Sequence, residues 1–308
     1  MTVSVVVCTR DRASLLADCL DAAARLAVPH GLSWEVLVVD NGSRDGTAEV
    51  VSSAAERLPA RRVVEAEPGL ARARNRAIAE ARGDYLLWTD DDVLPDPGWL
   101  RGYLSAFERH PEGAVFGGPV RPRLEAGTPA WLARTIHLVG GAFAARDLGP
   151  TERLLTPAWP DLPFGANYAV RAVEQRKHPY DEALGRTPGG GLGNEETLVL
   201  EAILSAGAEG WWVPEAGVVH RIPPSRQSTA YLRRYFEGEG RFDAWRAAAA
   251  QGSPGAPGRA GFLLRAAGAE AAYRLARAFR PPEAWVPSLI RAAEAWGRWR
   301  GAGPERAG

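Results

Sequence analysis

Short apolar runs alternate with amphipathic stretches through the first hundred residues. The first run, residues 3–8, is rich in β-branched valine, which favours a strand. Between Leu15 and Leu26, apolar residues then recur at the spacing of a helix. The same succession continues with expected strands at 34–39, 62–65 and 85–88 and expected helices at 48–57 and 68–82.

This alternation of strand and helix predicts an α/β fold, with a Rossmann-like, mostly parallel sheet and helices on both faces. In such sheets ligands bind beyond the carboxyl ends of the strands. Polar residues follow three of the expected strands, namely Thr9 and Arg10, then Asp40, then the triplet at 90–92. Because parallel strands end at one edge of the sheet, we expect these three groups to converge on a binding site there.

The acidic triplet Asp90-Asp91-Asp92 follows directly on the short apolar strand at 85–88. Three like charges at one place cost free energy unless a cation or other partners offset their repulsion. Mg²⁺ or Mn²⁺ carrying a diphosphate would offset it, because these ions favour carboxylate and phosphate oxygens. A solvated acidic turn is the alternative, since acidic residues are common in turns.

The composition is that of an ordinary globular protein with one large or two modest domains. Of the 308 residues, 46% are hydrophobic and 24% are charged, and 37 basic residues balance 37 acidic ones. A net charge of zero gives no support for nucleic-acid binding. Cys8 and Cys19 fall in apolar patterns and are expected to be buried free thiols. The chain opens with a strand and has no run of 18 apolar residues, which predicts a cytoplasmic protein.

Four motifs carry more specific information. They are Val-Val-Val-Cys-Thr-Arg-Asp-Arg at 5–12, Val-Val-Asp-Asn-Gly-Ser-Arg-Asp-Gly-Thr at 38–47, Gly-Leu-Ala-Arg-Ala-Arg-Asn-Arg-Ala at 69–77 and Gly-Asp-Tyr-Leu-Leu-Trp-Thr-Asp-Asp-Asp-Val at 83–93. In sequence, order and spacing they resemble the family-2 inverting glycosyltransferases. The resemblance extends over roughly residues 1–222 and implies the GT-A fold of nucleotide-diphospho-sugar transferases.

The resemblance also implies a domain organisation. Residues 1–222 would form the GT-A catalytic domain, with a nucleotide-sugar-binding half at about 1–95 and an acceptor-side half at about 96–222. Residues 223–308 would form a C-terminal helical extension, with expected helices around 231–241 and at 261–280 and 283–300 and a Pro/Gly linker near 251–258.

The last fifty residues combine nine arginines and four glutamates with several tryptophans, a net charge of +5. Basic, tryptophan-bearing amphipathic helices can lie on an anionic membrane surface, here as a peripheral contact on the inner face. Packing on the catalytic domain or on a second subunit, as a homo-oligomer, is the alternative.

For the donor, the resemblance assigns roles to the polar residues at the strand ends. It implies that Asp40 contacts the nucleotide base, that Thr9, Arg10 and Arg74 line the nucleotide pocket, and that Asp90 and Asp92, with Asp91 between them, form a DxD motif holding the ribose and a divalent metal, Mn²⁺ or Mg²⁺. A turn or cap residue is the alternative for Asp40. For Arg74, a solvated helix face is the alternative, as it is for Arg72 and Arg76.

Two segments of the second half resemble the acceptor side of these enzymes. Asn167, within 164–171, is the candidate contact for the donor sugar, with a turn-forming asparagine as the alternative. A glycine-rich stretch at 187–193 precedes Glu195 and Glu196 and predicts a mobile loop that delivers an acid. The family usually has Glu-Asp here, with the Asp as catalytic base, so the register favours Glu196 as base and leaves Glu195 as the other candidate. Helix N-terminal charge is the alternative for this pair.

His220 follows a strand-like segment at 217–219. In relatives a histidine at this strand end often completes the metal site, and imidazole is a normal ligand of Mn²⁺-type sites. A structural histidine is the alternative.

Inversion requires one base, which deprotonates the acceptor hydroxyl as it attacks the anomeric carbon from the face opposite the diphosphate. The expected partners are a nucleotide-sugar donor and a sugar, lipid-linked or small-molecule acceptor.

Two other functions share part of this pattern. A sugar-1-phosphate nucleotidyltransferase should have a glycine- and basic-rich phosphate loop after the first strand, where this chain has Cys-Thr-Arg-Asp-Arg at 8–12. A non-catalytic nucleotide-sugar-binding protein would have no need of an acid at 195–196 behind a glycine run. We therefore predict a glycosyltransferase.

Overall fold

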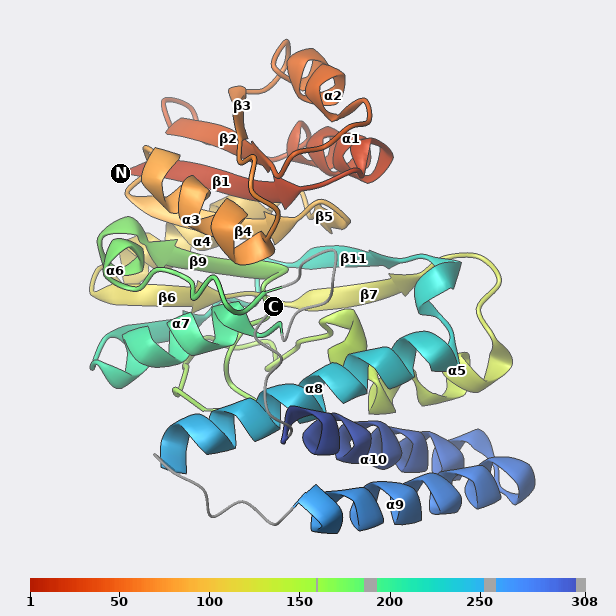
Figure 1. Cartoon of the computed structure of the whole chain (residues 1–308). Coiled ribbons are helices and arrows are strands. Elements are labelled where there is room, and N and C mark those ends of the chain that lie inside the picture. Colours follow the sequence, from red (N-terminus) through yellow and green to blue (C-terminus); the bar gives the residue numbers. More distant parts are fainter. Residues whose placement is uncertain (159, 186–192, 252–258, 303–308) are drawn as a thin grey trace. The chain divides into compact units, whose positions relative to one another are not determined.

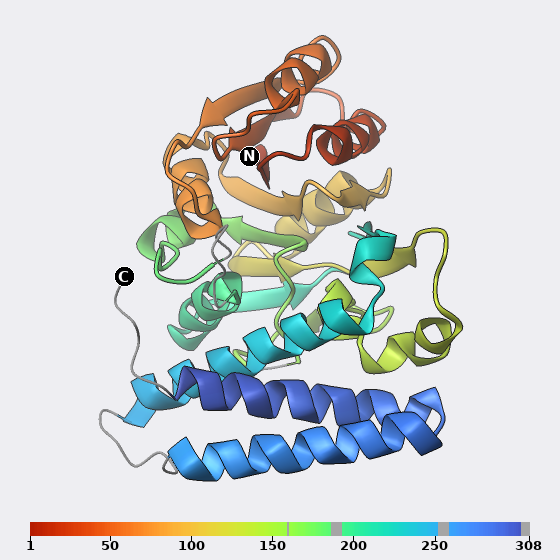
Figure 2. The same ribbon diagram turned by 45° about the vertical axis from the view of Figure 1, so that its right-hand side comes forward.

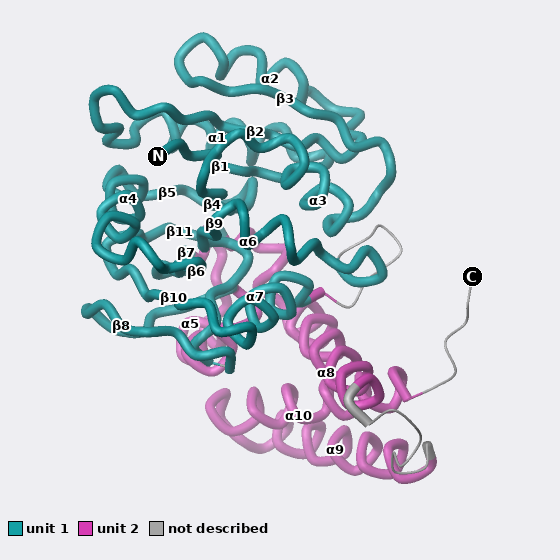
Figure 3. Tube along the Cα trace, turned by 90° about the vertical axis from the view of Figure 1, so that its left-hand side faces the viewer, with its two compact units in different colours: residues 1–123, 144–190, 194–221 teal, residues 124–143, 191–193, 222–308 magenta. Residues whose placement is uncertain are grey.

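The computed structural model describes residues 1–158, 160–185, 193–251 and 259–302. The glycine-rich stretch at 187–193 and the linker near 251–258 therefore lie, except for Gly193 and Gln251, outside the described residues. The chain divides into two compact units, one of residues 1–123, 144–190 and 194–221 and the other of residues 124–143, 191–193 and 222–308 (Figure 3). The longest segment of the second unit begins at Ile222.

An eight-stranded sheet forms the centre of the first unit (Figure 1). Its order is β3 (Ala60–Val64), β2 (Ser33–Asp40), β1 (Thr2–Thr9), β4 (Tyr85–Asp90), β9 (Asn167–Arg171), β6 (Gly113–Gly117), β10 (Glu209–Trp212) and β8 (Arg153–Leu154). The first four strands are parallel, β9 runs against both β4 and β6, and β10 is parallel to β6. The predicted mostly parallel α/β sheet is confirmed.

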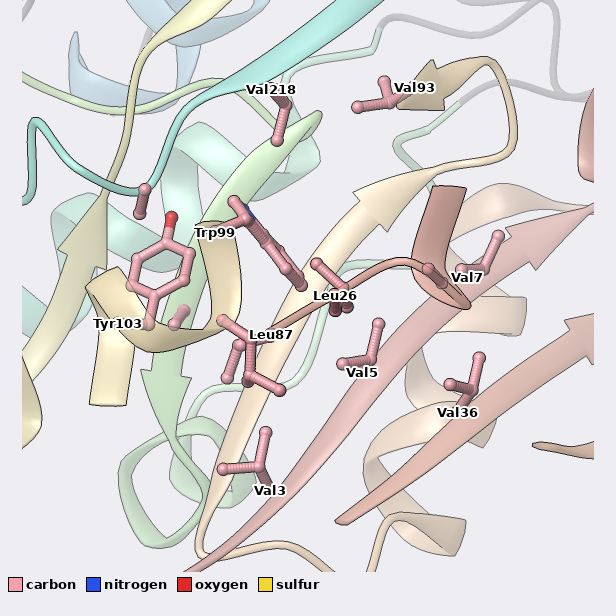
Figure 4. Packing of buried hydrophobic residues seen from close by; sticks show 14 of the residues in the cluster. Val3, Val5, Val7, Leu26, Val36, Leu87, Val93, Trp99, Tyr103 and Val218 are labelled. Atoms are coloured by element: carbon pink, nitrogen blue, oxygen red, sulfur yellow. The ribbon is translucent and has the colours of Figure 1, made fainter. Parts of the chain in front are cut away.

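Helices cover both faces of this sheet, because successive apolar residues of a strand point to opposite sides. Val3, Val5 and Val7 share one side of β1 and one buried cluster (Figure 4), whereas Val6 belongs to the cluster on the other face. The first cluster includes residues of α1 (Ala13–Ala23), α2 (Thr47–Ala54) and α4 (Trp99–Arg109), and the second includes residues of α3 (Leu70–Glu80), α6 (Ala172–Lys177) and α7 (Glu195–Ser205). The helices predicted within the first hundred residues are α1, α2 and α3.

Two details of β1 and β4 differ from the expectations. Strand β4 extends two residues beyond the predicted 85–88, because Thr89 still pairs with β9 and Asp90 with Cys8 of β1. Cys19 is a buried free thiol as predicted, but Cys8 is half-buried, and burial raises the pKa of its thiol to about 12.

A three-stranded sheet follows the acidic triplet, in the order β5 (Val93–Pro95), β11 (Val218–Ile222) and β7 (Val120–Leu124). Strand β11 runs antiparallel to β5 and places His220 opposite Val93. In addition, the backbone N–H of Arg221 donates to the Asp92 carbonyl at 3.0 Å. This pairing brings β11, which is distant in the sequence, next to the acidic triplet.

The second unit is helical. It contains α5 (Ala130–Thr135), 3-10 turns at Ile136–Leu138, Gly140–Phe143 and Pro224–Arg226, and the helices α8 (Thr229–Gln251), α9 (Arg259–Phe279) and α10 (Pro282–Gly301). Figures 1 and 2 both show α9 and α10 side by side, and the predicted C-terminal helices are thereby confirmed. A side chain at Gly240 of α8 would lie 2.1 Å from the Glu294 carbonyl of α10, so only glycine permits this close helix crossing. No helix within the described ranges is long and apolar enough to cross a membrane.

Candidate active site

The carboxyl ends of β1, β2 and β4 lie side by side. In the strand register, Thr9 is opposite Asp40 and Cys8 is opposite Asp90. The three polar groups that were expected to converge are therefore at one edge of the sheet, where parallel α/β proteins bind their ligands.

The centre of the acidic triplet is Asp91, which is only 3% exposed. Its carboxylate accepts hydrogen bonds from the Thr9 hydroxyl at 2.7 Å and from Arg12 Nη1 at 2.8 Å. Arg12 also approaches Asp92 Oδ2 at 3.3 Å. Burial raises the pKa of Asp91 to about 6, although the nearby Arg12 acts to lower it. Arg12 thus offsets part of the like-charge repulsion within the triplet, a role that the sequence analysis did not assign.

Asp92 and His220, two of the residues predicted to hold a metal, lie next to each other. His220 Nε2 lies 3.4 Å from Asp92 Oδ1, and both residues are buried. A carboxylate oxygen with an imidazole nitrogen suits Mn²⁺, and oxygens of a bound diphosphate and water would complete its coordination. Within the described ranges, no group of three or more His, Cys, Asp or Glu residues is arranged to hold a metal.

Asp40 is 1% exposed at the end of β2. Its Oδ1 accepts the backbone N–H of Ser43 at 2.8 Å, and its Oδ2 accepts from Arg62 Nε at 2.9 Å and Nη2 at 2.6 Å. Burial acts to raise the pKa of Asp40, but the hydrogen bonds from Ser43 and Arg62 hold it below its ordinary value. The turn bond to Ser43 matches the structural alternative, and the remaining acceptor capacity of the ionised carboxylate is compatible with a base contact.

Asn41 organises the chain between β3 and α3, which the sequence analysis did not foresee. Its Nδ2 donates to the carbonyls of Glu65 at 3.0 Å and Glu67 at 2.7 Å, and its Oδ1 accepts the Gly69 N–H at 2.8 Å. Arg10 Nη1 in turn donates to the Asn41 carbonyl at 3.2 Å. Asn41 is part of the motif at 38–47, but its hydrogen-bond partners lie about two dozen residues further along the chain.

Arg74 is the buried arginine of α3. It is 4% exposed, whereas Arg72 and Arg76 have side chains 43% and 45% exposed and pair with surface carboxylates. The solvated helix face that was the alternative for all three arginines therefore applies to Arg72 and Arg76 but not to Arg74. Its guanidinium also lies over the ring of Tyr180, with 5.3 Å between Cζ and the ring centroid.

The partners of Arg74 are the two glutamates at the start of α7. Arg74 Nη1 donates to Glu195 Oε1 at 2.7 Å and to Glu196 Oε2 at 3.4 Å. Burial acts to lower the pKa of Arg74, but these carboxylates hold it well above its ordinary value. Glu196 Oε1 also accepts the backbone N–H of Gly165 at 3.1 Å. A Cβ at Gly165 would lie 2.7 Å from Arg74 Nη2, so glycine at this position leaves room for the cluster.

Asn167 has no hydrogen-bonding capacity left for a ligand. Its Oδ1 accepts from Trp99 Nε1 at 2.7 Å and from the Tyr103 hydroxyl at 2.8 Å. Its Nδ2 donates to the carbonyls of Pro119 at 3.0 Å and Ala216 at 2.7 Å. Because the residue is fully buried and all four bonds are made within the protein, Asn167 is a structural residue of β9 and not the predicted sugar contact.

The comparison with protein families agrees with the site. The family profile described as glycosyl transferase family 2 matches residues 4–158, which is half of the chain. The family match identifies a glycosyltransferase, and its fold is GT-A. The chain belongs to glycosyl transferase family 2.

Two relatives illustrate the sequence similarity. The chain is 26% identical over 247 residues to the succinoglycan biosynthesis protein ExoM of Rhizobium meliloti, covering 77% of this chain and 73% of that protein. It is 31% identical over 200 residues to the glucosyl-3-phosphoglycerate synthase of Mycolicibacterium paratuberculosis, covering 55% of this chain and 57% of that protein.

Solved structures show the same fold. The mannosyltransferase PcManGT from Pyrobaculum calidifontis, in complex with GDP-Man and Mn²⁺, has a TM-score of 0.57 and 21% identity, covering 98% of this chain and 76% of that one. S. aureus TarS in complex with UDP-GlcNAc has a TM-score of 0.54 and 17% identity, covering 80% and 67%. At these identities the likeness is one of fold, and it supports the GT-A prediction.

Proposed function

We propose that the protein transfers a sugar from a nucleotide-diphospho-sugar to an acceptor hydroxyl, with inversion at the anomeric carbon and with Glu196 as general base. The observation that carries this proposal is the difference between the two adjacent glutamates. Glu195 has a side chain 2% exposed and is paired with Arg74, whereas the side chain of Glu196 is 13% exposed. The more accessible carboxylate is the one that an acceptor hydroxyl could approach.

The donor would bind at the carboxyl edge of β1, β2 and β4. Asp40 would accept a hydrogen bond from the nucleotide base, and Thr9, Arg10, Asp90 and Asp91 would line the nucleotide and ribose. Support comes from the shared edge of these residues and from relatives solved with UDP-GlcNAc and GDP-Man. Arg74 faces the glutamates, so we assign it the positioning of Glu196 in place of a nucleotide contact.

A divalent metal, Mn²⁺ or Mg²⁺, would be held by Asp92 and His220, with Asp90 at the same strand end. When bound, it would supply positive charge to the leaving nucleoside diphosphate. The protein's own contribution is to orient these ligands. The Arg221 N–H donates to the Asp92 carbonyl and so fixes the backbone there, and Arg12 donates to the Asp92 carboxylate and so orients it.

Glu196 would hold the proton of the acceptor hydroxyl. Its carboxylate is fixed by the Gly165 N–H on one oxygen and by Arg74 on the other. A base held in this way needs little reorganisation when the hydroxyl attacks. Glu196 is one methylene longer than the aspartate usual in the family, and the glycine at position 165 gives it room.

The proposal is tested with a panel of nucleotide sugars and acceptors in the presence of Mn²⁺. We expect release of nucleoside diphosphate together with a glycoside whose anomeric configuration, read by proton NMR, is opposite to that of the donor. A retained configuration would exclude Glu196 as an inverting base. Formation of a nucleotide sugar from a sugar phosphate and a nucleoside triphosphate would instead identify a nucleotidyltransferase, and donor binding without turnover would identify a binding protein.

A further inference from the structure

Helix α9 has an inner side that packs in the core of the second unit. Ala266 and Tyr273 are buried there, and Ala269 and Ala276 are partly buried beside them. These residues are three or four positions apart, so they form one face of the helix. Figures 1 and 2 show this helix lying along α10.

The opposite side of α9 is apolar and exposed. Leu264, Leu275 and Phe279 are 76%, 65% and 78% exposed. Counted from Leu264, Leu275 lies about three helical turns and Phe279 about four turns further along the chain, at about 3.6 residues a turn. All three are therefore on one side of the helix. Gly268 and Ala271 lie between them and are also exposed. We call Leu264, Gly268, Ala271, Leu275 and Phe279 the outer stripe.

The outer stripe is unusual for a surface facing water. A surface helix normally presents polar residues on the side opposite its core face. Here the outer stripe contains no charged residue, and α9 carries four of the nine large hydrophobic residues exposed within the described ranges. An exposed apolar strip of this kind marks an interaction surface.

The charges beside the outer stripe indicate what covers it. Residues 259–280 contain five arginines and one acidic residue, Glu270. Arg265 and Arg274 are adjacent in sequence to Leu264 and Leu275, on opposite flanks of the stripe at about a quarter turn. Glu270 is already paired with Arg233 at 2.8 Å and with Arg274 at 3.1 Å. The outer stripe is therefore flanked by one arginine on each side, Arg265 and Arg274.

These charges favour a lipid surface over a second copy of the chain. Pairing two outer stripes would bring arginines against arginines, and α9 has no second carboxylate to meet them. Anionic headgroups would instead pair with the flanking guanidinium groups, while the arginine stems extend along the apolar surface. No described helix can span a membrane, so the contact would be in the plane of the interface.

We propose that α9 binds the surface of an anionic membrane, with the outer stripe in the boundary between headgroups and acyl chains and with Arg265 and Arg274 at the lipid phosphates. This inference stands independently of the transfer chemistry. The sequence alone left membrane contact and self-association of the basic C-terminal region as alternatives. The proposal selects membrane contact and names the face of α9 and the residues that make it.

The test is sedimentation of the full chain with vesicles of phosphatidylcholine containing about 30% phosphatidylglycerol, compared with pure phosphatidylcholine. We expect the wild-type chain to bind the anionic vesicles about tenfold more tightly or better. The double substitution Leu264→Ser with Leu275→Ser should weaken this binding by about tenfold or more, and Arg265→Gln with Arg274→Gln should weaken only the component specific to phosphatidylglycerol.

Leu154→Ser with Val173→Ser is the matched control, because these residues of the first unit are also exposed, at 54% and 52%. This control should bind as the wild type does, and none of the variants should change the thermal unfolding midpoint appreciably, since exposed side chains are replaced. Equal binding of wild type and the Leu264/Leu275 variant would overturn the proposal, as would equal binding to both vesicle types. If wild type binds no vesicles but forms a dimer in analytical ultracentrifugation that this variant loses, the outer stripe is covered by a second copy and the lipid proposal fails.

Discussion

Glu195 holds Arg74 in a buried ion pair of 2.7 Å, with side chains only 2% and 5% exposed. Its neighbour Glu196 lies further from Arg74, at 3.4 Å, and is more exposed, so the two glutamates have different environments. Removing one partner of a buried pair leaves the other charge without compensation, whereas a half-buried carboxylate can exchange its contacts for those of a substrate. The two glutamates should therefore respond differently to the same conservative substitution.

Glu196→Gln should abolish most of the transfer activity. Glutamine keeps the shape and the bond from Gly165 but cannot accept the hydroxyl proton, so kcat should fall by about 10²–10⁴-fold, the usual contribution of a general base. Donor affinity, measured by isothermal titration calorimetry, should be unchanged. Glu201→Gln on the same helix is the control and should keep full activity. Full activity of the Glu196→Gln enzyme would mean that another residue is the general base.

Glu195→Gln should act mainly on stability. The substitution removes the charge that Arg74 contacts at 2.7 Å, while Glu196 still offers partial compensation. We expect a loss of about 2 kcal/mol in the free energy of unfolding, measured by urea denaturation, the order expected for a buried charged hydrogen bond. Its effect on kcat at a temperature where the protein is folded should be smaller than that of Glu196→Gln. The reverse ranking would exchange the roles of the two residues.

Metal binding should depend on both Asp92 and His220. Mn²⁺ with a nucleoside diphosphate should raise the thermal unfolding midpoint of the wild type, because a ligand that binds the native state stabilises it. Asp92→Asn and His220→Ala should each reduce this metal-induced shift, and chelation should reduce transfer. His178→Ala, on the loop after α6, is the matched histidine control. A full Mn²⁺-induced shift in both site variants would refute the proposed pair.

Asn167→Ala should destabilise the fold without weakening donor binding. The substitution removes the partner of Trp99 Nε1, of the Tyr103 hydroxyl and of the Ala216 carbonyl, whereas the Pro119 carbonyl keeps its bond from the Val218 N–H at 2.9 Å. A loss of about 3 kcal/mol in the free energy of unfolding is expected from several unsatisfied buried groups. The folded fraction should bind donor normally. Reduced donor affinity at unchanged stability would restore Asn167 as a ligand.

Acid sensitivity should include a contribution from Glu35, far from the site at the start of β2. Burial acts to raise its pKa, but hydrogen bonds from Arg61, Ser4 and the Arg82 N–H hold it below the ordinary 4.5. Glu35 therefore binds a proton more readily in the unfolded chain than in the folded one. Its contribution to the free energy of unfolding is fully present above pH 4.5 and is lost as the pH falls through the lower folded pKa. Glu35→Gln should flatten the pH dependence of urea unfolding in that window, whereas the exposed Glu56→Gln should not. An unchanged profile in Glu35→Gln would contradict this assignment.

The sequence predicted the first four strands, the three helices between them, the C-terminal helices and the edge where the polar groups meet, because apolar periodicity and strand ends are local signals. It could not predict the role of Arg12, whose partners Asp91 and Asp92 are about 80 residues away. Gly165 was missed for the same reason, because the space that this glycine leaves is filled by Arg74 and Glu196, which are distant in the sequence. Asn167 was misassigned because a buried, fully bonded amide and a ligand-binding amide have the same local sequence.

The place of β9 in the sheet has a consequence for any shortened version of the protein. The family profile ends at residue 158, yet in the described part of the chain β4 and β6 are joined through β9, which begins at Asn167. A fragment cut at the end of the profile would leave both strands with unpaired backbone groups in the middle of the sheet, a template for association with other chains. The stretch that identifies the family by sequence is thus shorter than the stretch that completes the sheet, and expression trials should extend through β11.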